Sequence, residues 1–317
     1  MNYYISFAKG FKMKHKTLSF FAILCLSLIA LTVTLASCNS FAETEYAIVG
    51  EGLTFDIYTY DQYENSTVRI TAVESIPAHL TIPERLNGMT VVEIAEGAFA
   101  DNDTLLYLKL PTGAIKLGSG FCSGSIALTA IDLAGSVSAI PENAFEDCSN
   151  LARVDGISQV TSIGSQAFAG CSSLALLDLP EVLTDIGPEA FRGCTSLARI
   201  NIPASVASIG ESAFWGCDGL VEAVMLCSAE IPEYCFLGCA SLTSVKIGDN
   251  VKAISGEAFR NCRALYSLEI GKNCKAIGDY AFHACDELTE IVIADRSAIS
   301  IGEGNESLDG TNNKEAE

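Results

Sequence analysis

The sequence repeats itself with a period of about 23 residues, and this period constrains the fold more than any other feature. The segment AFAGCSSLALLDLP at 167–180 recurs as AFRGCTSLARINIP at 190–203 and as AFHACDELTEIVI at 281–293. The Phe of this segment, here called the anchor Phe, occupies nine positions: Phe99, Phe121, Phe145, Phe168, Phe191, Phe214, Phe236, Phe259 and Phe282. A repeat of roughly 20–50 residues is typical of a solenoid, whose coils bury apolar side chains only against their neighbours. We therefore expect one solenoid with a continuous core.

Other residues keep fixed distances from the anchor Phe. An Ile precedes most anchors by five residues, a Cys follows seven of them by three residues, and a Leu stands three residues beyond the Cys. The apolar residues that follow alternate, which is typical of a strand with one buried face. The Ala-Phe-x-x-Cys segment is short, so we expect a helix of one or two turns or a 3₁₀ turn. The predicted fold is an α/β repeat solenoid: a right-handed superhelix with a parallel β-sheet on one face, short helical or 3₁₀ turns opposite, and a β-rich N-terminal cap.

The recurring order Ile-Gly, Ala-Phe, Gly-Cys, Leu and a strand ending in Pro resembles the BspA-like leucine-rich repeat family. The resemblance extends over about residues 79–301. Relatives in this family are surface proteins, and some are reported as adhesins that bind host extracellular-matrix proteins. The resemblance therefore implies binding at a cell surface, but repeat folds serve many partners, so it does not imply a ligand.

The first 37 residues are typical of an export signal. Four Lys residues precede an apolar run at 18–35, and the run ends in LASC at 35–38. LASC resembles the lipobox of bacterial lipoproteins, which implies cleavage before Cys38 and lipidation of Cys38. A start at Met13 would leave MKHK before the apolar run, which is a more usual signal. The alternative interpretation is a signal-anchor helix that happens to end in Cys.

The rest of the chain divides into four segments. Residues 38–45 are expected to form a lipidated linker. Residues 46–90 are expected to form a β-rich cap, because LTFDIYTY and STVRITAVE alternate like strands. Residues 91–301 carry nine repeats and a truncated tenth, SAISIGEGN at 297–305, which lacks the Phe. Residues 302–317 are polar and acidic, and we expect a disordered tail.

The acidic charge of the chain limits its partners. The formal net charge is −20, and removal of residues 1–37, which hold four Lys and no Asp or Glu, makes it −24. Such a charge disfavours binding to nucleic acids and to anionic membrane surfaces. Membrane attachment is therefore expected through acyl chains on Cys38, in which each buried methylene contributes roughly 0.8 kcal/mol.

Thirteen Cys residues raise the question of disulfides or a metal site, but their pattern favours buried thiols. Seven form one column in a stack whose neighbouring strands lie about 4.8 Å apart, and this spacing is within the Cα–Cα range of disulfides. Their side chains point in parallel, however, which suits disulfides poorly. Cys235 and Cys274 replace small buried residues in other columns, whereas Cys122 is the one that we expect to be exposed. Cys235 and Cys239 lack a second Cys pair or a nearby His, which disfavours zinc.

The sequence offers no catalytic motif. After residue 37 it holds only His79 and His283, and it shows no Ser-His-Asp order, Walker loop, HExxH motif or dinucleotide fingerprint. We therefore expect a protein that is not an enzyme and that has no cofactor.

Residues two and four places after each repeat Leu are expected to face outward on the sheet, the usual binding surface of leucine-rich repeats. The first outward column reads Tyr107, Ala130, Arg153, Leu176, Arg199, Glu222, Ser244, Ser267 and Glu290. The second reads Lys109, Asp132, Asp155, Asp178, Asn201, Val224, Lys246, Glu269 and Val292. Like charges at Asp132, Asp155 and Asp178, on adjacent strands, would be destabilising. Either Arg153 and Arg199 neutralise them, or a divalent cation does, or the carboxylates stay solvated and repel one another.

A second candidate surface directly follows the anchor Phe. This column, here called the turn ridge, reads Arg192, Trp215, Leu237, Arg260 and His283 over consecutive repeats. Trp and Arg are enriched at binding hot spots, so the turn ridge is a candidate ligand-binding patch. The alternative is a row of variable turn residues that face solvent.

The favoured function is that of a cell-surface lipoprotein that binds macromolecules, in the manner of an adhesin or another protein-interaction module. Its partner would be an extracellular or host protein, and its location the bacterial envelope, at the outer membrane or cell surface. A glycan-binding lipoprotein of a nutrient-uptake system is the alternative, although Tyr107 is the only aromatic residue in the outward strand columns. A purely structural envelope protein is a third hypothesis, and the oligomeric state stays open.

Overall fold

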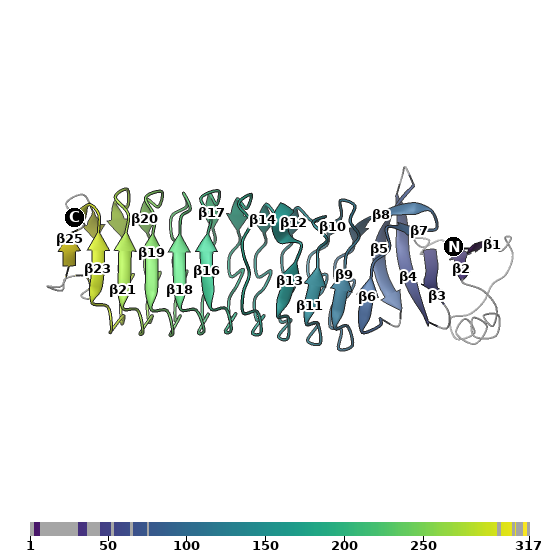
Figure 1. The fold of residues 1–317 in the computed structure, drawn as a ribbon, viewed down its shortest axis with the longest axis horizontal. Helices are drawn as coiled ribbons and strands as arrows, with labels where there is room; N and C mark the ends of the chain where they lie inside the picture. The colour runs from purple at the N-terminus through teal and green to yellow at the C-terminus, as the bar shows by residue number, and fades with distance from the viewer. Residues whose placement is uncertain are drawn as a thin grey trace.

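The computed structural model describes residues 3–6, 31–36, 45–51, 54–63, 66–74, 76–296, 299–305, 308 and 313–315. The protein is a parallel β-solenoid of about ten coils, one coil for each repeat, and the coils stack in a single row (Figure 1). Each coil has three sides: a long strand, a short strand, and a turn segment that carries the anchor Phe.

The long strands lie where the sequence alternates, and they pair in parallel from coil to coil. They are β6 (His79–Thr81), β9 (Tyr107–Lys109), β11 (Ala130–Asp132), β13 (Arg153–Asp155), β16 (Arg199–Ile202), β18 (Glu222–Met225), β19 (Ser244–Ile247), β21 (Ser267–Ile270) and β23 (Glu290–Ile293). One sheet has the order β13-β11-β9-β6, and a second begins at β16 and continues through β23.

The two long-strand sheets are separate because residues 174–180 form no strand. In the preceding coil, Gly156 takes the position of the buried Leu133, and its φ of +76° turns the chain into the 3₁₀ helix η1 (Ile157–Gln159). A Cβ at this position would lie 2.7 Å from the backbone nitrogen of Ala134. The interruption of the predicted sheet thus lies one coil after Gly156, a position where any side chain would clash with the backbone.

The short strands form the second side of the solenoid, and each ends in a buried apolar residue, except β24, whose Ile301 is half-buried. They are β10 (Lys116–Leu117), β12 (Ala139–Ile140), β14 (Ser162–Ile163), β15 (Asp185–Ile186), β17 (Ser208–Ile209), β20 (Ala253–Ile254), β22 (Ala276–Ile277) and β24 (Ser300–Ile301). They pair in the orders β12-β14-β15-β17 and β20-β22-β24. The Ile predicted five residues before each anchor is the buried residue of this side.

The turn segment that carries the anchor Phe is not helical, contrary to the expectation of a short helix or 3₁₀ turn. In one coil, the N–H groups of Gln166, Phe168 and Gly170 donate to carbonyls of the next coil at 2.8–2.9 Å. The N–H groups between them donate to carbonyls three residues back within the same coil, such as that of Ala169 to Gln166 at 3.1 Å. Left-handed φ angles of +53° at Gln166 and +73° at Gly170 produce this alternation and prevent a helix. Among the elements whose bounds lie within the described residues, η1 is the only helix.

Seven of the nine anchor Phe rings, from Phe145 to Phe282, form one continuous stack inside the solenoid, and Phe121 meets Phe145 edge-to-face. All nine are at most 1% exposed, and from Phe145 to Phe282 successive ring centroids lie 5.0–5.3 Å apart with interplanar angles of 2–16°. Each coil therefore completes its core only through its two neighbours, as predicted for a solenoid.

The Cys column lies beside the Phe stack, and all eleven described Cys residues are free and buried. In seven coils the column thiol donates to a carbonyl of the preceding coil at 3.0–3.3 Å. These residues are Cys148, Cys171, Cys194, Cys217, Cys239, Cys262 and Cys285. The column is thus a row of small buried residues that also satisfy backbone acceptors.

Cys122 is fully buried, so the expectation that it is exposed is wrong. Its N–H donates to Ala144 in the next coil, as the N–H of an anchor Phe does elsewhere, while Phe121 occupies the preceding Ala position. The same shift by one residue brings Ser125, rather than Gly124, to the Cys position, where its hydroxyl donates to the carbonyl of Phe99.

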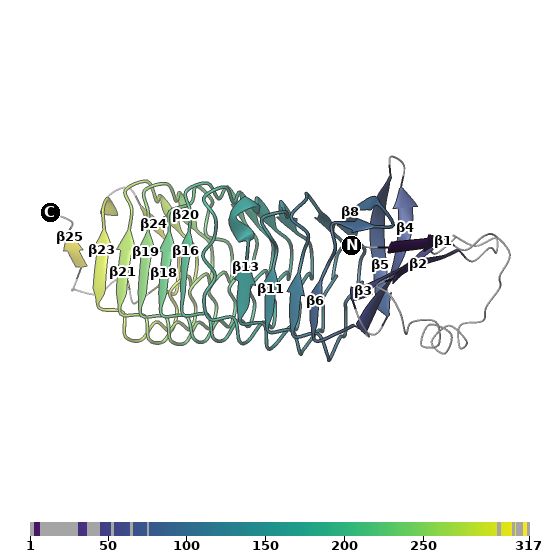
Figure 2. The same ribbon diagram turned by 45° about the vertical axis from the view of Figure 1, so that its right-hand side comes forward.

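The N-terminal end of the solenoid is closed by strands, visible beside the coils in Figure 2. They are β1 (Tyr3–Ser6), β2 (Leu31–Ala36), β3 (Glu45–Glu51), β4 (Thr54–Tyr63), β5 (Thr67–Glu74), β7 (Arg85–Leu86) and β8 (Met89–Ile94). Strands β3, β4 and β5 are antiparallel, and β8 pairs in parallel with both β5 and the short strand β10. The segment expected to cap the core is therefore continuous with the short-strand side.

The C-terminal coil extends beyond the predicted boundary at residue 301. Asn305 lies 23 residues after Phe282, in the anchor position, and its side-chain oxygen accepts the Phe282 N–H at 2.9 Å. Leu308 is fully buried in the corresponding Cys position, and β25 (Asn313–Glu315) pairs in parallel with β23. Residues 302–305 and 308 thus belong to the last coil, in which an Asn replaces the Phe.

No helix within the described ranges has the length and apolar character that crossing a bilayer requires.

Candidate ligand-binding surfaces

The outward columns of the long strands lie in the predicted register. Tyr107 pairs with Ala130, which pairs with Arg153, and Lys109 pairs with Asp132, which pairs with Asp155. In the second sheet Arg199 begins the first column, followed by Glu222, Ser244, Ser267 and Glu290. The side chains of these columns are exposed or half-buried, so the sequence correctly assigned the outward face.

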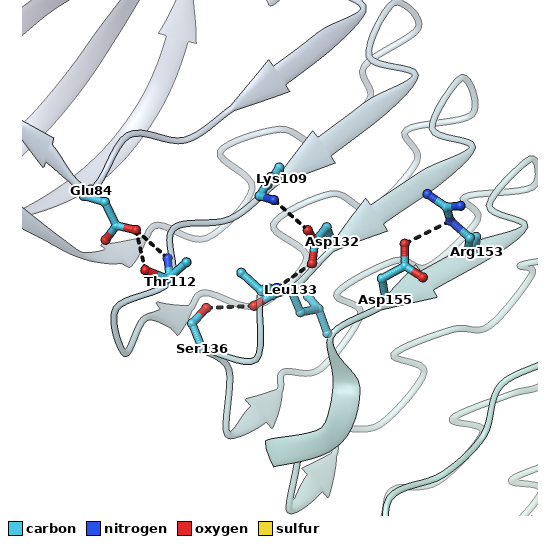
Figure 3. A network of polar contacts seen from close by, with 9 residues as sticks. Glu84, Lys109, Thr112, Asp132, Leu133, Ser136, Arg153 and Asp155 are labelled. Carbon is cyan, nitrogen blue, oxygen red and sulfur yellow. Dashed lines mark hydrogen bonds and ion pairs between the residues drawn. The ribbon is translucent and has the colours of Figure 1, made fainter.

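On the first sheet, each outward carboxylate has its own cation (Figure 3). The Lys109 ammonium lies 3.1 Å from Asp132, and the Arg153 guanidinium lies 2.9 Å from Asp155. Asp132 also accepts the N–H of Ala134 at 2.8 Å. Burial by itself raises the pKa of Asp132, but this hydrogen bond and the Lys109 ammonium outweigh it, so the pKa lies below its ordinary value.

The structure does not bring Asp178 into the predicted row of three carboxylates. Asp132 and Asp155 face each other on paired strands, whereas Asp178 lies in the interrupted coil. Arg153 neutralises Asp155, as one hypothesis held, but Lys109 rather than Arg199 neutralises Asp132. Within the described ranges, no group of three or more His, Cys, Asp or Glu side chains has metal-binding geometry.

The turn ridge is built by the turn segments, and its order follows from the hydrogen bonds between coils. The N–H of Gly193 donates to the carbonyl of Trp215 at 2.8 Å, and the N–H of Gly216 donates to Leu237 at 2.9 Å. Side chains directly after consecutive anchors therefore lie side by side. Trp215 is 40% exposed, and the Arg192 guanidinium lies over its ring, 4.8 Å from the centroid.

Two Glu residues that the sequence analysis did not single out hold the ridge arginines. Glu189 lies 2.9 Å from Arg192, and Glu257 lies 2.6 Å from Arg260. A hydrogen bond from Gln166 is the main cause that holds the pKa of Glu189 below its ordinary value, and Arg192 adds to it. The repeated string EAFR at 189–192 and 257–260 could have predicted these two Glu–Arg pairs from the sequence.

The last ridge residue, His283, contacts Tyr280, with ring centroids 5.6 Å apart in an edge-to-face arrangement. Tyr280 is 43% exposed and takes the same coil position as Glu189 and Glu257. The ridge therefore changes character along the solenoid, from an Arg–Trp pair to a Tyr–His pair. The predicted lipidation site, Cys38, lies outside the described residues.

Coils that each bury one anchor Phe and one column Cys, with outward columns that vary, define a leucine-rich-repeat solenoid protein. The chain belongs to the BspA-type leucine-rich repeat family: the family described as "BspA type Leucine rich repeat region" matches residues 92–221 and 228–306 in six copies. Proteins of this class are typically interaction modules and non-enzymatic scaffolds.

The chain is similar to solved structures of bacterial leucine-rich repeat proteins. A leucine-rich repeat protein from Bacteroides ovatus is 26% identical, with a TM-score of 0.59, over 80% of this chain and 67% of that one. A leucine rich cell surface protein from Faecalibacterium prausnitzii is 22% identical, with a TM-score of 0.45, over 83% of this chain and 96% of that one. No curated protein matches the sequence.

Proposed function

We propose that the protein binds another protein, extracellular or of a host, at the bacterial cell surface, and that the turn ridge makes the central contact. The observation that carries this proposal is the Arg192–Trp215 pair. The Trp215 ring is exposed, yet Arg192 covers one side of it and is itself fixed by Glu189. A side chain that is already ordered loses little conformational entropy on binding, and Trp and Arg are the residues most enriched at hot spots.

The proposed location is the cell surface, with Cys38 as a lipid anchor. The LASC motif supports the anchor, and the family and the printed description of the Faecalibacterium protein support the surface. Incorporation of radiolabelled palmitate into the full chain, but not into its Cys38→Ser variant, tests the anchor. Protease digestion of intact cells tests the orientation, because only an outward-facing solenoid would be cleaved.

The protein-binding role is tested by a screen of immobilised extracellular-matrix proteins against the full chain. We expect Trp215→Ala and Arg260→Ala to weaken binding of the partner by at least tenfold, a loss typical of hot-spot residues. Tyr266→Ala is the matched control, because Tyr266 is also exposed, at 47%, but lies on the long-strand side. Equal binding by the ridge variants and the wild type would remove the ridge from the proposal.

A further inference from the structure

An open groove lies on the turns that follow the long strands β18, β19 and β21, on a different side of the coil from the turn ridge. The groove encloses about 460 Å³. The six residues that line it are polar or charged, and they come from three consecutive coils: Ser228, Asp249, Asn250, Lys252, Asn273 and Lys275. A polar concave surface of this kind suits a hydrophilic ligand rather than an apolar one.

Two amide side chains in the groove are fixed by the solenoid backbone. Asn250 donates from Nδ2 to the carbonyl of Leu226 at 3.0 Å, and Asn273, one coil further on, donates to the carbonyl of Asp249 at 2.8 Å. Each amide uses one N–H in this way, which leaves its oxygen and its other N–H to a ligand. The two amides are therefore pre-organised, in the same orientation, one coil apart.

The two groove lysines are also neighbours, because the N–H of Lys275 donates to the carbonyl of Lys252 at 2.8 Å. The one carboxylate of the lining, Asp249, is already paired: it accepts the N–H of Lys272 at 3.0 Å and lies 3.2 Å from its ammonium. Lys275 lies 3.4 Å from Asp295 in an exposed pair, and such pairs contribute only about 0–1 kcal/mol, so a ligand can displace this one.

The groove is an exception in a strongly acidic chain. Two lysines, Lys252 and Lys275, line it against one carboxylate, although the formal net charge of the chain is −20. The overall charge repels a long polyanion such as nucleic acid. The local charge instead favours a short ligand with few carboxylates and many hydroxyl groups.

The coil spacing favours a sugar chain within that class. The Phe rings of these coils lie 5.0 and 5.1 Å apart, which measures the distance from one coil to the next. Equatorially linked pyranose rings advance along their chain by nearly the same distance. Successive sugar rings can therefore meet successive coils, two of which present the same Asn and Lys groups.

We propose that this groove binds an acidic oligosaccharide, with a uronic-acid carboxylate between Lys252 and Lys275 and sugar hydroxyls on the amides of Asn250 and Asn273. This site goes beyond the proposed protein-binding function, because it uses another side of the coil and another class of ligand.

The experiment is isothermal titration calorimetry of the full chain with the β-1,4-linked trisaccharide of mannuronic acid. β-1,4-Mannotriose is the matched neutral ligand, since it differs only in carrying hydroxymethyl groups in place of the carboxylates. We expect the acidic trisaccharide to bind and the neutral one to bind at least tenfold more weakly. We expect the Lys252→Met/Lys275→Met variant to lose at least tenfold in affinity for the acidic trisaccharide.

Lys246→Met is the matched control, because Lys246 is an exposed lysine of the same coils that points from β19 and pairs with Glu269. It should bind the acidic trisaccharide within twofold of wild type, and so should Trp215→Ala, which separates this site from the turn ridge. The single Lys252→Gln variant repeats the test should the double variant melt early. Absence of binding, equal loss in Lys246→Met, or equal affinity for mannotriose, inorganic phosphate or an acidic hexapeptide would overturn the proposal.

Discussion

Replacement of Phe191 by Ala tests whether the stacked rings hold the solenoid together as one core. Phe191 is fully buried in the middle of the row, and its ring centroid lies 5.3 Å from that of Phe168 and 5.2 Å from that of Phe214. The two interplanar angles are 7° and 2°. The substitution therefore leaves a cavity that two neighbouring coils line, and it removes two ring contacts at once.

The expected loss of unfolding free energy is large and has two parts. Truncation of a buried Phe to Ala costs about 3–5 kcal/mol of unfolding free energy, because apolar burial is lost and a cavity remains. Aromatic pairs contribute about 0.5–1.5 kcal/mol beyond their buried area, so Phe191→Ala should lie at the upper end of that range. Phe282→Ala should cost about 1 kcal/mol less, because Phe282 has one stacked neighbour, Phe259, and Asn305 on its other side.

The measurement is urea unfolding of the full chain, followed by far-UV circular dichroism and by fluorescence. The sequence holds a single Trp, Trp215, directly after Phe214. Its fluorescence therefore reports unfolding of the coil that follows that of Phe191. Agreement of the two probes shows that the solenoid unfolds as one unit. A double-mutant cycle of Phe191→Ala and Phe214→Ala should give a coupling of about 0.5–1.5 kcal/mol. Zero coupling, with equal losses in Phe191→Ala and Phe282→Ala, would refute the reasoning.

Three further predictions concern the last coil, the thiols and the strand face. Asn305→Leu should lower the unfolding free energy by about 1–3 kcal/mol, because the Phe282 N–H loses its acceptor; an unchanged urea midpoint would contradict this. Iodoacetamide at neutral pH should label none of the described thiols in the native chain and all of them in urea, since burial raises the pKa of Cys148 and Cys217 to about 12; labelling of native Cys122, located by mass spectrometry, would contradict its burial. The carboxylate of Asp132 has a lowered folded pKa, so its stabilisation is present above the ordinary value of 3.8 and is lost as the pH falls through the folded pKa. Asp132→Asn should therefore destabilise the chain at neutral pH and match wild type in acid, and a difference in urea midpoint that is independent of pH would count against the Lys109–Asp132 pair.

The interior of the coils could be predicted from the sequence because its residues recur at a fixed period. The anchor Phe, the Ile of the short strand, the repeat Leu and the column Cys are all buried where the period places them. The spacing between anchors also indicates where the register of the repeat changes. The spacings of 22 and then 24 residues around Phe121 mark a shift by one residue, which puts Cys122 in the anchor position.

Features that depend on single backbone conformations could not be predicted. The turn segments are kept from forming helices by left-handed φ angles at residues such as Gln166 and Glu189, which have no sequence preference for that conformation. The break between the two long-strand sheets lies at residues 174–180, one coil after Gly156, whose left-handed backbone starts the 3₁₀ helix η1. The cation partners on the strand face depend on side-chain reach, so Lys109 rather than Arg199 neutralises Asp132.

The same architecture explains why the candidate sites lie outside the repeating pattern. Every coil buries the same side chains, so a substitution at an outward position changes the surface without disturbing the stack. The turn ridge and the groove combine outward residues that differ between coils with backbone positions that the coils share, such as the carbonyl of Trp215 and that of Lys252. In a chain with a formal net charge of −20, partners that are themselves acidic are repelled everywhere except where cations gather. On the long-strand face Lys109, Arg153 and Lys246 are each paired with a carboxylate. In the groove Lys252 and Lys275 lie on neighbouring coils, and a ligand has only the exposed Lys275–Asp295 pair to displace. Recognition of an acidic ligand is therefore expected at the groove, and recognition of a protein at the Arg192–Trp215 pair.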